Sequence, residues 1–100
     1  YEIDLHTILE HMSEANKDGQ LKAVEINASP YRLDLDWRLC KRAKDLQVPI
    51  VINPDAHSIK GLGDIDYGVM IARKGWLEAG DILNSLTCEE IYERLPGAKI

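Results

Sequence analysis

The chain has 100 residues, a formal net charge of −5 and 45% hydrophobic residues. This length is typical of one domain, and this composition excludes a disordered chain. The negative charge excludes binding of nucleic acid by overall electrostatic attraction, so such binding needs a local basic patch or bridging cations. No apolar run reaches the ~18 residues of a membrane span.

The cysteine content bears on the cellular compartment. Only Cys40 and Cys88 are present, and they lie far apart in the chain. We expect them to be free, packed thiols rather than a disulfide, which fits the reducing cytoplasm. We therefore predict a cytoplasmic location with no membrane partner.

The chain begins with a helix and a strand. Apolar residues at helical spacing predict a helix that starts after Asp4 and ends near Gly19; they are Leu5, Ile8, Leu9, Met12 and Ala15. Residues 22–28 are short and apolar around one carboxylate, which predicts a strand. Ser29-Pro30 ends that strand.

The middle of the chain repeats this alternation. A second helix is predicted over residues 35–46, with Asp34 or Asp36 as its N-cap. A buried strand follows over residues 50–53. After a glycine-containing loop, a third helix is predicted over residues 64–73.

The last segment contains one ambiguous stretch and one clear helix start. Gly75 is expected to end the third helix. Residues 79–86 fit either a helix or a short strand. Thr87 and Glu90 have the spacing of a capping box, which predicts a final helix that ends at Pro96-Gly97.

Strands that alternate with helices predict a parallel sheet covered by helices. Two strands, or three at most, are few for a complete sheet, so we expect part of a larger α/β layer or barrel. In such folds ligands bind at the carboxyl ends of the strands. Both predicted strands end in polar residues, which makes this edge the candidate site.

Asp55 and His57 are the strongest candidates for chemistry. They follow the second strand two residues apart, and in an extended segment their side chains would point the same way. One oxygen and one nitrogen donor make a candidate metal site that needs further ligands from elsewhere. The alternative is a turn, because Asn-Pro-Asp is common turn chemistry.

Glu25 and Asn27 are the second candidate pair, since they share one face of the first strand. The alternative is that Glu25 is paired with Arg32 or Lys22 at the strand end. Arg32 is itself a candidate phosphate contact through its guanidinium fork. Its alternative role is an ion pair with a nearby aspartate.

Four strings in this chain carry a resemblance to a known family. They are VEINASPYRLDL at 24–35, INPDAHSIKGL at 52–62, YGVMIARKGWL at 67–77 and DILN at 81–84. Together they resemble the PHP (polymerase and histidinol phosphatase) domain, in the version attached to bacterial and archaeal family X DNA polymerases. The resemblance covers nearly the whole chain, with its motifs in order.

The resemblance implies a distorted (β/α)7 barrel that holds two or three zinc or manganese ions and hydrolyses phosphoesters. It implies that Asp55 and His57 are metal ligands. Glu25 and Asn27 would lie beside the site and either support the metal ligands or contact the substrate, and Arg32 would contact phosphate. The implied activity is that of a 3′–5′ exonuclease or 3′-phosphatase that acts on a DNA 3′ end, with a polymerase core in the same chain.

The chain also departs from the family. The amino-terminal His-x-His motif, the central Glu and the other metal-binding histidines are absent, and His6 and His11 match no ligand position. Residues 1–100 therefore resemble a single partial domain, the C-terminal part of a PHP domain. We expect this piece alone to be catalytically inactive and to self-associate through an exposed sheet edge and apolar surface.

Two other functions remain open. One is a stand-alone, histidinol-phosphatase-like hydrolase of small phosphate monoesters. The other is a non-catalytic module, derived from a PHP domain, that binds a partner.

Overall fold

The structure, a computed structural model, describes residues 4–31 and 33–95. Its α-helices and strands, in chain order, are α1 (Leu5–Lys17), β1 (Val24–Asn27), α2 (Trp37–Asp45), β2 (Ile50–Asn53), α3 (Ile65–Lys74) and α4 (Cys88–Arg94). Short 3-10 turns are η1 (Lys60–Asp64), η2 (Ala79–Asp81) and η3 (Leu83–Ser85). The predicted alternation of helices and strands is confirmed, with shifts of one or two residues at most boundaries.

Side-chain caps explain where three helices begin. Asp4 accepts a hydrogen bond from the Thr7 amide at 3.1 Å at the start of α1. At α2 the cap is Asp36, which accepts from the Arg38 amide at 2.8 Å. The predicted capping box of α4 is present in both directions between residues 87 and 90. Each cap satisfies an amide that has no partner within its helix.

The two strands are neighbours and run parallel, as predicted. Their register pairs Val24 with Ile50 and Asn27 with Asn53. Both strands therefore end at the same edge. Among the described residues this sheet has two strands, so it is part of an α/β fold and does not by itself form a barrel.

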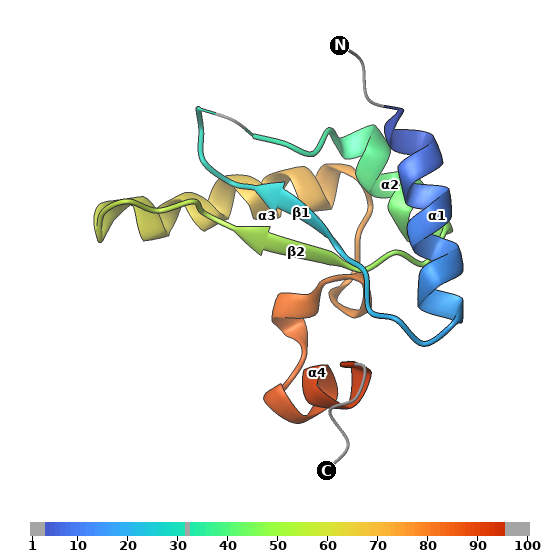
Figure 1. The fold of residues 1–100 in the computed structure, drawn as a ribbon. Helices are drawn as coiled ribbons and strands as arrows, with labels where there is room; N and C mark the ends of the chain where they lie inside the picture. Colours follow the sequence, from blue (N-terminus) through green and yellow to red (C-terminus); the bar gives the residue numbers. More distant parts are fainter. Residues whose placement is uncertain (1–3, 32, 96–100) are drawn as a thin grey trace.

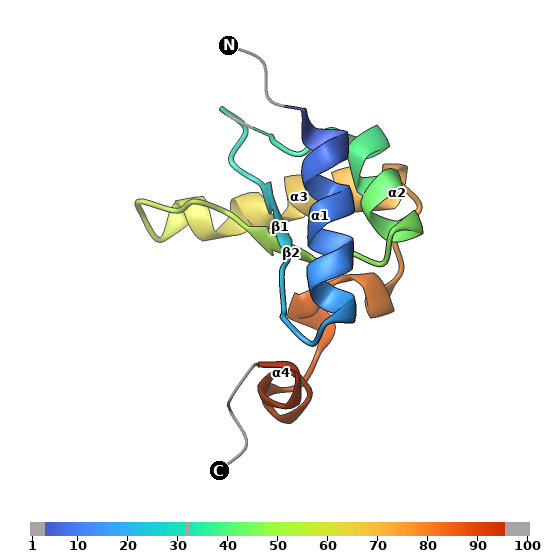
Figure 2. The same ribbon diagram turned by 45° about the vertical axis from the view of Figure 1, so that its right-hand side comes forward.

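Helix α3 covers one face of the sheet. In Figure 1, α3 lies behind both strands, and α1 and α2 lie next to each other at one end; Figure 2 gives the same arrangement from another side. The core consists of apolar residues from the strands, these three helices and the segments next to them: Leu9, Ile26, Ala28, Cys40, Ala43, Val48, Ile50, Ile52, Ala72 and Ile82. Within the described part of the chain, no helix covers the opposite face of the sheet.

Gly68 allows α3 to approach the sheet closely. A Cβ atom at this position would lie 2.5 Å from Cγ2 of Ile52 and 2.9 Å from Cβ of Ala28. Both distances are shorter than any real Cβ contact. Only glycine therefore permits the observed separation of helix and sheet.

The ambiguous stretch 79–86 is neither a helix nor a full strand. It consists of η2 and η3 with a single parallel bridge between Ile82 and Ile50. Two residues further on, the Asn84 side chain binds the Ile52 backbone. Its Oδ1 accepts from the Ile52 N–H and its Nδ2 donates to the Ile52 carbonyl, both at 2.8 Å. The amide group takes the place of a neighbouring strand and closes the outer edge of β2.

Both cysteines are free, as predicted. Cys40 is buried in the core, whereas Cys88 is exposed, so the expectation of packing is wrong for Cys88. That residue opens α4 on the outer side of this short helix, away from the core cluster. Among the described residues, no helix is long and apolar enough to cross a membrane. The expected helix end at Pro96-Gly97 lies outside the described residues.

Candidate functional site at the carboxyl ends of the strands

The polar ends of β1 and β2 meet at one edge of the sheet. Glu25 and Asn27 flank Ile26, which is fully buried against α3. Because side chains alternate along a strand, Glu25 and Asn27 lie on the face that carries no helix among the described residues. The prediction that they share a face agrees with this burial pattern.

Two hydrogen bonds connect the strands across this face. Asn53 Nδ2 donates to Glu25 Oε2 at 3.0 Å, and Asn27 Nδ2 donates to Asp55 Oδ2 at 3.3 Å. Asn27 also accepts from the Ser29 amide through its Oδ1 at 3.0 Å, which fixes the orientation of its side-chain amide. The structure therefore joins one member of each predicted pair, Asn27 and Asp55, by a hydrogen bond. Glu25 is bound separately, by Asn53 rather than by Lys22.

Asp55 has a left-handed backbone conformation, with φ of 55°. The expectation that residues 53–57 are extended is therefore wrong, and strand alternation does not relate Asp55 to His57. Aspartate tolerates this conformation better than most residues, and Asn-Pro-Asp favours a turn after the strand. Asp55 thus combines the turn with an exposed carboxylate that is held by Asn27.

His57 is oriented by the same turn. Its Nδ1 lies 2.9 Å from the Asp55 carbonyl oxygen, a distance at which a protonated Nδ1 donates a hydrogen bond. In that tautomer Nε2 carries a lone pair on the exposed side of the ring. Histidine ligands of metals are commonly oriented in this way by a backbone carbonyl.

The donor set at this edge is incomplete for a metal. Asp55 offers carboxylate oxygen and His57 offers imidazole nitrogen, which suit zinc or manganese. Within residues 4–31 and 33–95, however, no group of three or more His, Cys, Asp or Glu side chains is arranged to hold an ion. The two residues therefore fit a metal only if other parts of a protein supply the remaining ligands.

The other candidate residues take no part in these hydrogen bonds in the described structure. Arg32 lies outside the described residues, so its predicted contact with phosphate stays a prediction. His6 and His11 are exposed on α1, as expected of surface histidines. Sequence reasoning did not assign a site role to Asn53, although the polar strand ends pointed to it. It missed the Asn84 clamp, for which the sequence has no local signal.

The fold and this edge define the segment as part of a parallel α/β protein whose candidate site lies at the strand ends. The chain is 40% identical over 91 residues, which are 91% of its length, to the DNA polymerase/3′-5′ exonuclease PolX of Bacillus subtilis (strain 168). It spans only 15% of the length of that relative. No protein-family model matches the chain, and no solved structure matches it. The similarity fits the resemblance to the PHP region of a family X polymerase.

Proposed function

We propose that the chain is the C-terminal part of a PHP-type phosphoesterase domain in a family X DNA polymerase. The observation that carries the proposal is the 40% identity over 91 residues to a polymerase that is also a 3′-5′ exonuclease. It favours this function over a stand-alone phosphatase or a non-catalytic module. In the intact protein the activity would be 3′–5′ exonuclease or 3′-phosphatase action on a DNA 3′ end in the cytoplasm, with a polymerase core in the same chain.

Asp55 and His57 are proposed as metal ligands. Support comes from the exposed Asp55 carboxylate and from the hydrogen bond that leaves Nε2 of His57 open. A bound zinc or manganese ion would lower the pKa of a coordinated water and neutralise charge on the phosphoryl group. We propose further that the intact domain is a (β/α)7 barrel and that other parts of this barrel supply the remaining metal ligands.

Glu25 and Asn27 are proposed to orient the site. Asn27 holds the Asp55 carboxylate, and Glu25 fixes Asn53 at the end of the neighbouring strand. These contacts hold polar side chains of two neighbouring strand ends in place before substrate arrives. Arg32 is proposed to bind a phosphate of the DNA, since a guanidinium matches phosphate with two parallel hydrogen bonds.

The first prediction concerns the metal ligands in the intact protein. Asp55→Asn and His57→Ala should each lower manganese-dependent shortening of a labelled DNA 3′ end by roughly 100-fold or more, since loss of an outer partner alone costs about 10- to 100-fold. Polymerase activity in the same protein should stay unchanged.

His11→Ala is the matched control, because it removes an exposed histidine on α1. The 100-residue chain alone should show no exonuclease activity, since the described residues supply two candidate ligands. Full exonuclease activity in either site variant, or full activity of the isolated chain, would overturn the proposal.

A further inference from the structure

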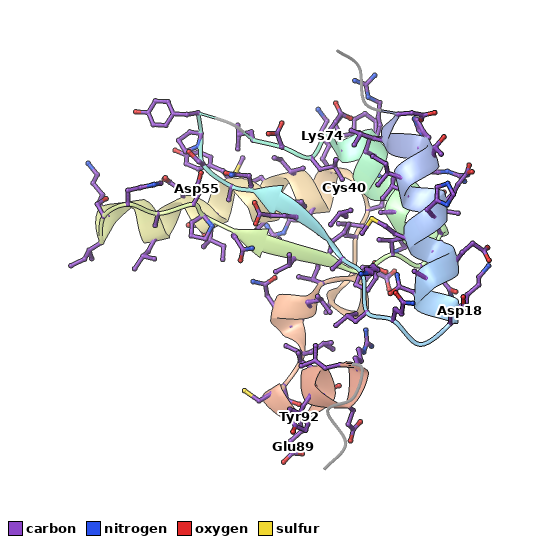
Figure 3. All side chains as sticks on the ribbon, in the orientation of Figure 1. Asp18, Cys40, Asp55, Lys74, Glu89 and Tyr92 are labelled. Carbon is purple, nitrogen blue, oxygen red and sulfur yellow. The ribbon has the colours of Figure 1, made fainter. Side chains whose placement is uncertain are left out.

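A second feature lies where the end of α3 packs on the start of α2. Two tryptophans and three cations gather there: Trp37, Arg38 and Lys41 of α2, Lys74 at the end of α3, and Trp76 just after it. We refer to these five residues as the tryptophan patch. Figure 3 shows Lys74 beside the start of α2, well separated from Asp55.

Gly75 brings the two elements together. A Cβ atom there would lie 2.9 Å from the Trp37 carbonyl oxygen and 3.1 Å from Cβ of Cys40. Only glycine permits this contact, so the relative position of the two tryptophans is determined by close packing. The backbone segments that carry the two tryptophans are therefore held next to each other.

The cations of the patch lie over the indole rings. Arg38 and Lys74 lie 5.8 and 5.4 Å from the centre of the Trp37 ring. Lys41 lies 5.3 Å from the centre of the Trp76 ring. These are cation–π distances, which hold the charges at the surface without neutralising them.

The charges of the patch differ in how they are paired. Arg38 forms an ion pair with Asp36 at 3.1 Å. Among the described residues, Lys41 and Lys74 contact no carboxylate. The nearby Asp36 carboxylate still feels both cations of its surroundings, since Arg38 and, more weakly, Lys74 lower its pKa. Three cations therefore stand beside one carboxylate here, on a chain whose net charge is −5.

Trp76 is 72% exposed and has a left-handed backbone conformation, with φ of 64°. It occupies the turn after α3, where the Trp76 amide donates to the Arg73 carbonyl and the Leu77 amide to the Ala72 carbonyl, both at 3.0 Å. Glycine is the preferred residue at this position of a helix end. The Trp76 indole therefore adds little to the stability of the fold, and its exposed face can contact another molecule.

We propose that the tryptophan patch binds single-stranded nucleic acid. A base stacks on the exposed face of Trp76, and backbone phosphates contact Lys41 and Lys74. Aromatic platforms beside unpaired cations are the usual means by which proteins bind single strands without sequence preference. The inference is independent of the proposed metal site, because it uses none of its residues and needs no metal.

Intrinsic fluorescence measures this binding directly, since the two tryptophans of the chain both lie in the patch. Titration of the full chain with an oligothymidine in EDTA and low salt should quench the tryptophan emission in a saturable manner. Raising the salt should weaken binding, with a slope of about −0.7 per phosphate contact. An unchanged emission at about millimolar oligonucleotide would overturn the proposal.

Variants at Trp76 separate binding from folding, with anisotropy of a fluorescein-labelled oligothymidine as the measurement. Trp76→Gly should weaken binding by roughly 5- to 150-fold, the range for loss of one base–aromatic stack. Its melting temperature should be unchanged or higher, because glycine suits this backbone. Trp76→Phe should retain most of the affinity. Binding by Trp76→Gly at the wild-type level would refute the stacking role.

Paired lysine variants test the charges. Lys41→Ala/Lys74→Ala should reduce the salt slope by about 1.4, or 0.7 for each lysine. Lys17→Ala/Lys22→Ala is the matched control, since it removes two exposed lysines near the end of α1 and gives the same net charge of −7 (−5 − 2). An equal effect of both pairs would overturn the proposal. So would tighter binding of an oligoglutamate peptide than of the oligonucleotide, which would indicate a protein partner.

Discussion

At the scale of single residues, the two cysteines differ in how far they are buried. Cys40 is fully buried on the inner face of α2, while Cys88 is exposed at the start of α4. Burial raises the pKa of the Cys40 thiol from its ordinary value of 9.0 to about 11, and the negative charge of Asp36 adds to the shift. Because only the thiolate is a nucleophile, Cys40 is inert at neutral pH.

The raised pKa of Cys40 predicts how stability depends on alkaline pH. As pH rises from 9.0 to about 11, the thiol ionises in the unfolded chain but stays protonated in the folded one. The unfolded state then binds fewer protons, so the free energy of unfolding falls, by about 1.4 kcal/mol per pH unit at most. Urea denaturation between these pH values measures the decline.

Variants of the two cysteines provide the comparison. Cys40→Ala should show a smaller decline with pH, whereas Cys88→Ala should keep the wild-type decline. The explanation fails if Cys40→Ala retains the full wild-type dependence on pH.

At the scale of elements, the packing of α3 on the sheet positions the candidate site. Ile26 and Ile52 point toward α3, so their neighbours Glu25 and Asn53 lie on the opposite face. Gly68 sets the separation between helix and sheet. A shift of α3 would therefore move both strand ends and the hydrogen-bonded polar side chains that they carry.

Gly68→Ala tests this packing. Alanine favours a helix over glycine by about 1 kcal/mol, but its Cβ would overlap Ile52 and Ala28. We expect a net loss of about 1–3 kcal/mol in the free energy of unfolding, since overpacking a core forces the neighbours to move. Urea denaturation measures the change.

Gly80→Ala is the control for this substitution. A Cβ at position 80 would have no atom within 4 Å, so the variant should be near neutral. If Gly68→Ala is as stable as Gly80→Ala, then the close approach of α3 is not required for the fold.

At the scale of the whole molecule, the described residues form a two-stranded sheet of which α3 covers one face. Large apolar side chains are exposed near the candidate site, among them Ile59 at 89% and Leu62 at 58%. Residues three apart in a 3-10 helix lie on the same side, so these two form one apolar spot at η1. Such exposed apolar surface is typical of a contact with another protein or another part of the same one.

This surface predicts self-association of the isolated chain. The mean mass from static light scattering should rise with protein concentration. Ile59→Ser/Leu62→Ser should lower the association without loss of helix content, because neither side chain belongs to the core. A monomer mass at every concentration would contradict the prediction, and Tyr92→Ser is the control for an exposed apolar residue elsewhere.

Most of the fold could be predicted from local signals in the sequence. The helices follow from apolar spacing and from caps such as Asp4 and Thr87, which act within a few residues of the chain. The parallel pairing follows from the alternation of strands and helices, because a helical crossover returns the chain to the same edge. For the same reason, the sequence predicted that the polar ends of both strands meet at one edge of the sheet.

The remaining features depend on contacts between residues that are distant in the chain. The hydrogen bond from Asn27 to the Asp55 carboxylate and the clamp of Asn84 on Ile52 have no local signature. The tryptophan patch likewise exists because Gly75 packs on Trp37, which lies in another helix. The helices and strands and their order could be predicted because they depend on short-range spacing. The tertiary structure decided which side chains meet, because that depends on packing across the fold.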